Sequence, residues 1–326
     1  MRLREGVRLH QLGRLVEADA AYQEAAKLAP KNPDIANLRG LIALQSGRAD
    51  LALGYFDRAV KLAGNVADYH NNRGIALGRL GRIADADASF GRALSLRPRH
   101  PDANANRAKL LQQQGRTQEA IAHYQLAILS PRPMPEVLGG YGAALADLGR
   151  YAEAVELLRQ AVALAPGNSS IKYSLARCLQ GAGQSDDAAR VYRTLLESNP
   201  GHIDALSNLA GLLADIRQFE EAESFARRAV EIAPERAELY YNLGRLQQDG
   251  IQLAAAVQSY EAAITRRPDY ADAFCNLGNV RLAFGDIAEA QAAFRQALAI
   301  DPAHRAAFSS LLMSLNYDET AEPAEV

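Results

Sequence analysis

The chain has 326 residues, 48% of them apolar, and its 36 basic and 38 acidic residues give a formal charge of −2. This length and apolar content allow a continuous buried core, either in two ordinary domains or in one elongated repeat array. The balanced charge provides no basic face, which argues against DNA, RNA or an anionic membrane surface as a partner.

The N-terminal stretch, residues 1–20, is charged throughout and lacks the apolar segment of a signal peptide. No later stretch approaches the roughly 18 continuous apolar residues that indicate a membrane-spanning helix. We therefore expect a soluble, cytoplasmic protein. Cys178 and Cys275 form no CxxC pair and lie near no histidine cluster in the sequence, so we expect two buried, reduced thiols rather than a disulfide.

One pattern recurs every 34 residues along the chain. Glycines mark one phase of it: Gly13, Gly47, Gly81, Gly115, Gly149, Gly183 and Gly285. Alanines mark a second phase without interruption: Ala18, Ala52, Ala86, Ala120, Ala154, Ala188, Ala222, Ala256 and Ala290. Prolines close most repeats: Pro30, Pro98, Pro166, Pro200, Pro234, Pro268 and Pro302. A fixed period of this kind is typical of a repeat array in which each unit packs on its neighbours.

Each repeat contains the pattern of two helices. Residues 272–284 place apolar or small side chains at helical spacing, and Gly285 ends this segment because glycine accepts the left-handed conformation. Residues 287–300 form a second amphipathic segment, which Pro302 cannot continue. Small residues recur where the two helices must approach closely, including Gly6, Gly40, Gly74, Gly142, Gly244 and Gly278. Aromatic residues of the second helices recur beside them: Tyr22, Phe56, Phe90, Tyr124, Tyr192, Tyr260 and Phe294.

Two places depart from the pattern. Arg217 and Ile251 occupy the turn position that glycine fills elsewhere, although Gly250 is one residue away. Gly139 and Gly140 weaken the first helix that follows Pro133 and Pro135, so the array is expected to bend differently there.

A unit of 34 residues with two helices and with Gly, Ala, aromatic, Ala and Pro in this order resembles the tetratricopeptide repeat. The resemblance covers residues 1–302 and implies an all-α, right-handed superhelix whose first helices line a concave groove. About nine units are predicted, at residues 1–32, 33–66, 67–100, 101–134, 135–168, 169–202, 203–236, 237–270 and 271–302.

The C-terminal residues depart from the repeat. A solenoid exposes the apolar face of its last unit, so residues 303–317 are predicted to form a capping helix. Its apolar stripe is expected to comprise Phe308, Leu311, Leu312 and Leu315. Residues 318–326 form an acidic tail, which we interpret as a truncated linker.

A second resemblance concerns residues 309–326, SSLLMSLNYDETAEPAEV. This stretch is similar to the junction between repeats and catalytic lobes in bacterial proteins of the O-linked N-acetylglucosamine transferase and SPINDLY family. The positions that match are Leu315, Asn316, Tyr317, Asp318, Pro323 and Glu325. The resemblance implies that a glycosyltransferase follows these repeats in the parent protein, and none of its chemistry is found in this sequence.

No enzyme motif is found: a glycine-rich phosphate loop, HExxH and GxSxG are all absent, and the six histidines are scattered. We therefore predict no catalytic residue, no cofactor and no metal site for this chain.

Five asparagines share one phase of the first helices: Asn72, Asn106, Asn208, Asn242 and Asn276. An amide offers one acceptor and two donors, which suits a bound peptide backbone of any sequence. The resemblance to the transferase family also implies that such a ladder holds extended substrates. The alternative is that these amides only contact water. If they bind a peptide, the last three are expected to contribute most, because they lie on consecutive repeats.

Two charged rows occur on the same helices. An acidic residue in the first turn recurs as Asp34, Asp68, Asp102, Glu136, Asp204, Glu238 and Asp272. Stabilisation of the helix dipole explains these residues without a ligand, although the groove entrance could also prefer basic or hydroxyl-rich partners. The side chains of Arg39, Arg73 and Arg107 are expected to cover apolar surface while their guanidinium groups stay in water, with a binding role as the alternative.

We therefore predict an interaction scaffold that binds a protein or an extended peptide segment in its concave groove. The alternative is the substrate-recognition repeat region of an O-linked N-acetylglucosamine transferase-like enzyme. An assembly or chaperone adaptor is a third, weaker option. In the resembled family, the clamp for acidic C-termini needs lysine and asparagine on consecutive first helices, whereas this chain has Asn71, Ala105 and Gly139 at one key position.

Overall fold

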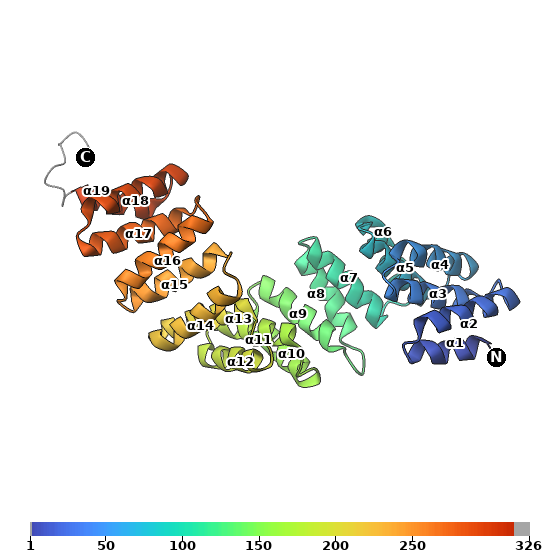
Figure 1. The fold of residues 1–326 in the computed structure, drawn as a ribbon. Coiled ribbons are helices and arrows are strands. Elements are labelled where there is room, and N and C mark those ends of the chain that lie inside the picture. The colour runs from blue at the N-terminus through green and yellow to red at the C-terminus, as the bar shows by residue number, and fades with distance from the viewer. Residues whose placement is uncertain (1, 316–326) are drawn as a thin grey trace. The chain divides into compact units, whose positions relative to one another are not determined.

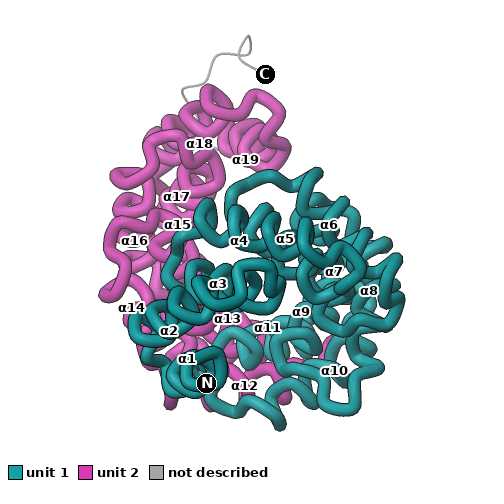
Figure 2. The backbone as a smooth tube through the Cα atoms, turned by 90° about the vertical axis from the view of Figure 1, so that its right-hand side faces the viewer, with its two compact units in different colours: residues 1–182 teal, residues 183–326 magenta. Residues whose placement is uncertain are grey.

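The structure, a computed structural model, describes residues 2–315, which form 19 α-helices and no strand (Figure 1). The chain divides into two compact units, residues 1–182 and 183–326 (Figure 2). Two helices alternate in each period of the sequence, so the predicted all-α solenoid of helix-turn-helix repeats is confirmed. Asn316, Tyr317, Asp318 and the acidic tail lie outside the described residues. The predicted boundaries of the array, of its units and of the cap stay predictions.

Unit 1 contains α1 to α11. The bounds are α1 (Arg2–Gln11), α2 (Leu15–Leu28), α3 (Pro33–Gln45), α4 (Ala49–Leu62), α5 (Ala67–Arg79), α6 (Ile83–Leu96), α7 (Pro101–Gln113), α8 (Thr117–Ala127), α9 (Pro135–Asp147), α10 (Tyr151–Leu164) and α11 (Ser169–Gly181). Within the unit, each helix from α1 to α10 packs against the next one in the chain. Successive first helices also contact each other, α3 with α5, α5 with α7, α7 with α9 and α9 with α11, so they share one wall of the unit.

Unit 2 contains α12 to α19. The bounds are α12 (Ser185–Ser198), α13 (Ile203–Asp215), α14 (Phe219–Ile232), α15 (Ala237–Asp249), α16 (Leu253–Arg266), α17 (Ala271–Phe284), α18 (Ile287–Ile300) and α19 (Arg305–Leu315). The same pattern of contacts holds here, because α13 contacts α15, α15 contacts α17, and α17 contacts α19.

A glycine of the first helix meets an aromatic ring of the second helix in most repeats. A Cβ atom added to Gly74 would lie only 2.5 Å from Cε1 of Phe90. The same clash, at 2.5–2.8 Å, occurs at four other pairs: Gly6 with Tyr22, Gly40 with Phe56, Gly244 with Tyr260, and Gly278 with Phe294. These rings are buried, as are the alanines of the second helices. The predicted role of the small residues, to let two helices approach, is confirmed.

The turn between the two helices of a repeat requires a left-handed residue. The seven turn glycines have φ between 72° and 82°. Arg217 and Ile251 adopt the same conformation, with φ of 63° and 62°, although they have side chains. Gly250 has a φ of −82° and therefore does not take over this role. A left-handed backbone costs an L-residue roughly 1–2 kcal/mol, so these two turns are strained.

The last helix buries a different stripe from the predicted one. Ala307 and Leu315 of α19 are buried, and Leu311 packs on the cluster around Phe294. Phe308 remains 56% exposed, however, so the prediction that it belongs to the covering stripe is wrong. Leu312 is 39% exposed and also lies off the buried stripe. The buried stripe of α19 thus combines Leu311 and Leu315, which were predicted, with Ala307 and Ser314, which were not.

Both cysteines, Cys178 and Cys275, are buried and free, as expected. Burial raises the pKa of each thiol.

In the described part of the chain, no helix is both long enough and apolar enough to cross a membrane.

The contact between Gly74 and Phe90 can be tested by Gly74→Ala. The added methyl group has no space, so we expect a loss of about 1–3 kcal/mol in the free energy of unfolding. Gly78→Ala on the same helix is the matched control, because nothing lies within 4 Å of its added Cβ. The control should gain up to ~1 kcal/mol from helix propensity. Urea unfolding measures both, and equal stabilities would contradict the close contact.

The strained turn can be tested by Ile251→Gly. We expect a gain of about 0.5–1 kcal/mol, because relief of the left-handed strain is partly offset by the backbone entropy of glycine. Little packing is lost, since Ile251 is 81% exposed. The control is Ile216→Gly, where φ is −94° and no strain is released. A thermal melt should rise for the first variant only, and a lower melting temperature for Ile251→Gly would disprove the strain.

Candidate functional site

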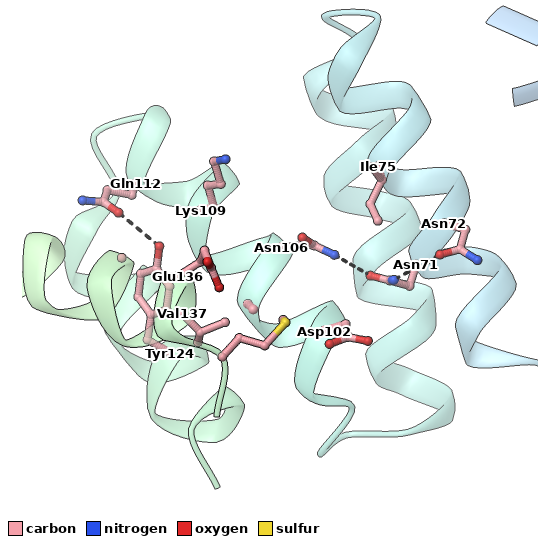
Figure 3. Close-up of a pocket in the computed structure, with 13 residues that line it drawn as sticks. Asn71, Asn72, Ile75, Asp102, Asn106, Lys109, Gln112, Tyr124, Glu136 and Val137 are labelled. Carbon is pink, nitrogen blue, oxygen red and sulfur yellow. Dashed lines mark hydrogen bonds between the residues drawn. The ribbon is translucent and has the colours of Figure 1, made fainter. Parts of the chain in front are cut away.

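The first helices of unit 1 line a cavity of about 480 Å³ (Figure 3). It lies over α5, α7 and α9, and α8 and the loop before α9 each contribute one residue. Its lining combines amide, apolar and charged side chains: Asn71, Asn72, Ile75, Asp102, Ala105, Asn106, Lys109, Gln112, Tyr124, Met134, Glu136, Val137 and Gly140. Two of the five predicted groove asparagines, Asn72 and Asn106, are therefore brought together in one site.

The cavity lies where a second helix is shortened. Helix α8 has 11 residues, whereas the other second helices have 14. Pro131 disfavours a helical conformation for Ser130, so the last turn is lost. A loop over residues 128–134 replaces it, and Met134 at the end of this loop lines the cavity. The prolines were visible in the sequence, but they did not reveal a cavity.

Gly140 is needed at the back of the cavity. It occupies the position in its repeat that Asn106 occupies in the preceding one, within the row of five asparagines that we call the asparagine ladder. A Cβ added to Gly140 would lie 2.7 Å from the hydroxyl oxygen of Tyr124. This buried hydroxyl donates to Oε1 of Gln112 at 3.2 Å, and its ring stacks on Tyr141 with centroids 5.8 Å apart. Burial, together with the charge of Asp147, raises the pKa of Tyr124 to about 12. Helix α9 is nevertheless continuous over Pro135–Asp147, so Gly139 and Gly140 do not interrupt it.

A chain of amides crosses three repeats beside the cavity. Nδ2 of Asn106 donates to Oδ1 of Asn71 at 3.0 Å (Figure 3). Asn71 in turn contacts Asn72 at 3.5 Å, and Asn72 donates to Asn37 at 2.9 Å. Asn106 and Asn72 thus each donate to the preceding repeat, whereas Asn71 donates to the adjacent Asn72. The chain therefore leaves Oδ1 of Asn106 on the side away from Asn71, as Figure 3 shows.

The other three asparagines of the ladder also donate within their unit. Asn208 donates to the hydroxyl of Tyr192 at 3.1 Å, Asn242 to Ser207 at 3.3 Å, and Asn276 to the hydroxyl of Tyr241 at 3.2 Å. All five ladder asparagines are half-buried. Their nitrogens thus join neighbouring helices, a role that neither sequence-based interpretation included. Peptide binding by these residues stays a proposal.

Most residues of the acidic row also have partners. Five of the seven pair with a side chain 29 to 35 residues later in the chain: Asp34 with Tyr69, Asp68 with Arg97 and His100, Asp204 with Arg236, Glu238 with Arg267, and Asp272 with His304. These contacts measure 2.5–3.2 Å. The helix dipole alone therefore does not account for the row. The remaining two, Asp102 and Glu136, line the cavity.

The arginine row is paired as well. Nε of Arg39 lies 2.8 Å from Asp19, and the corresponding atom of Arg107 lies 2.8 Å from Asp87. Arg73 lies 2.6 Å from Asp57. Each pair joins a first helix to the second helix of the preceding repeat. The guanidinium groups are thus held in ion pairs, whereas the sequence had suggested that they stay in water.

Comparison with known families agrees with this architecture. Models described as tetratricopeptide repeat match residues 3–67 and 71–135, residues 145–197 and 179–246, and residues 271–304. A model described as TPR repeat matches residues 252–284. The chain belongs to the tetratricopeptide repeat family. The first resemblance found in the sequence is therefore confirmed, and nothing in these matches supports the second, to the glycosyltransferase junction.

Several solved structures share the tetratricopeptide fold at low identity. Pseudomonas aeruginosa pilF is 19% identical with a TM-score of 0.57, covering 67% of this chain and 97% of its own. The C-terminal part of a TPR repeat-containing protein from Cytophaga hutchinsonii is 17% identical with a TM-score of 0.55, covering 74% and 99%. YrrB, described as a TPR protein with an unusual peptide-binding site, is 22% identical with a TM-score of 0.52, covering 55% and 92%. No curated protein matches the chain.

The amide chain can be tested by Asn106→Ala. The change leaves Oδ1 of Asn71, which is only 5% exposed, without its donor. We expect a loss of about 1–3 kcal/mol in the free energy of unfolding. Lys109→Ala is the control, since this exposed residue lies on the same helix and should change stability by less than ~0.5 kcal/mol. Chemical denaturation of both variants decides the point, and similar values for the two would rule out a structural role for Asn106.

Proposed function

We propose that this tetratricopeptide repeat protein is an interaction scaffold that binds an extended protein or peptide segment along its first helices. The cavity of about 480 Å³ in unit 1 carries this proposal. A space of this size with apolar walls and a few polar groups can hold several ligand atoms and fix their orientation. We propose that the chain acts by binding alone, without catalysis or a cofactor.

The amide chain supports a peptide as the ligand. The nitrogen of Asn106 is already committed to Asn71, so its carbonyl oxygen is oriented before any ligand arrives. A backbone N–H of an extended segment can donate to that oxygen whatever its sequence. The half-buried amides Asn208, Asn242 and Asn276 extend the same proposal to unit 2.

The comparisons support this role by analogy only. YrrB is described as having a peptide-binding site, and its likeness to this chain concerns the fold. Protein partners are also more consistent with a formal charge of −2 than nucleic acid or an anionic membrane surface.

Selection from a random peptide library displayed on phage tests the proposal. Selected peptides are titrated against Ala105→Tyr, whose ring fills the cavity without removing a hydrogen bond, and against Ala122→Tyr, an exposed position of α8 outside the lining. We expect Ala105→Tyr to weaken binding at least tenfold and Ala122→Tyr to leave it unchanged. A third variant, with Asn208, Asn242 and Asn276 all changed to Ala, tests the sequence-based expectation that these three contribute most. The geometry instead favours the site around Asn72 and Asn106.

Two results would overturn the proposal. One is the failure to select any peptide, and the other is selected peptides that bind Ala105→Tyr as tightly as the parent chain.

A second candidate role is the recognition of protein substrates for an O-linked N-acetylglucosamine transferase-like enzyme in the parent protein. It rests on the resemblance of residues 309–326, of which the structure describes only 309–315. Both roles use the same groove, and they differ in what the coding sequence specifies after Val326. A catalytic domain there would favour this alternative.

A further inference from the structure

The acidic row follows a rule that two of its members break. In five repeats the partner lies 29, 32 or 35 residues later in the chain, at the end of the repeat or just beyond it. His100, Arg236 and His304, for example, all follow their acidic partner by 32 residues. Each of these carboxylates is thus neutralised or hydrogen-bonded within the array.

The corresponding positions after Asp102 and Glu136 offer no such partner. Pro131, Met134 and Val137 stand at these positions for Asp102, and Ala165, Asn168 and Ile171 for Glu136. The amide oxygen of Asn168 caps its own helix by accepting from the backbone of residues 170 and 171. Both residues are exposed, and across residues 2–315 neither carboxylate makes a side-chain hydrogen bond or an ion pair.

Both carboxylates line the same cavity, on the first turns of α7 and α9 (Figure 3). The nearby arginines of the row do not compensate them, because Arg73 and Arg107 are held by Asp57 and Asp87. Lys109 is the single cation of the lining. It lies two helical turns after Asp102, about 10 Å along the axis of α7, and among residues 2–315 it makes no ion pair with Asp102 or Glu136.

We infer that this cavity selects a segment that carries a lysine or arginine side chain. The cationic group pairs with Asp102 or Glu136, and its aliphatic stem lies on the apolar part of the lining, Ile75 and Val137. The adjacent backbone of the segment donates to Oδ1 of Asn106. The inference rests on the proposed function, and it adds the chemistry of the partner: a basic peptide rather than an acidic or purely apolar one.

The test uses the full chain and two parallel selections from the random peptide library. One selection uses the parent chain, and the other uses the double variant Asp102→Asn with Glu136→Gln, which keeps the shape of the cavity and removes its charge. Peptides selected on the parent should be enriched in lysine or arginine, and those selected on the variant should not. A basic peptide should lose affinity for the double variant by about tenfold or more, and its binding should weaken with added salt.

Asp204→Asn is the matched control, because it removes a first-turn carboxylate that Arg236 already neutralises in unit 2. It should leave peptide affinity within about twofold. Peptides that compete for the cavity, as shown by their loss of binding to Ala105→Tyr, but lack basic residues would overturn the inference and leave the proposed function standing. If no peptide is selected, or none responds to Ala105→Tyr, the proposed function fails and the inference fails with it.

Discussion

The contact between a first-helix glycine and a second-helix aromatic ring sets the geometry on which the other interactions depend. Since an extra methyl group at Gly74 has no room beside Phe90, the two helices of that repeat have one fixed separation. Repetition of this contact places each repeat similarly on the previous one within a unit. Side chains 32 or 35 residues apart therefore come within hydrogen-bond distance in several repeats. Examples are the pair Asp68 with His100 and the pair Asn276 with Tyr241.

The cavity lies where this regularity is relaxed. The shortened helix α8 yields a longer loop, and Gly140 removes a side chain from the ladder so that Tyr124 can occupy the space behind it. The same loop places Pro131 and Met134 where other repeats carry the cation that neutralises the first-turn carboxylate. The same loop thus contributes to the space and leaves Asp102 unpaired, whereas Glu136 lacks a partner because Ala165, Asn168 and Ile171 stand at the positions that follow it.

The helices and the packing joint could be predicted from the sequence, because period and residue size determine them locally. Arg217 and Ile251 occupy the position of the repeat that glycine fills elsewhere, and this position has the left-handed conformation whichever residue fills it. The pairing of Asn106 with Asn71 could not be predicted, since the position of a residue within its repeat does not reveal which side chain of the neighbouring repeat it contacts. The exposure of Phe308 could not be predicted, because it depends on how α19 is rotated against its neighbours. The cavity could not be predicted either, because it results from a side chain that Gly140 lacks and from the turn that α8 lacks.

The ladder of asparagines shows why a structural and a binding role need not compete. A nitrogen that holds two repeats together fixes the amide plane, so the protein loses little entropy when a ligand meets the remaining oxygen. Asp102 and Glu136 differ, because they stabilise no neighbour and lie in a cavity that also holds apolar surface. A cationic side chain of the proposed ligand would therefore not have to displace an existing partner of either carboxylate. In the proposed complex, the amides preorganise the array, while the two unpaired carboxylates give the selectivity for a basic ligand.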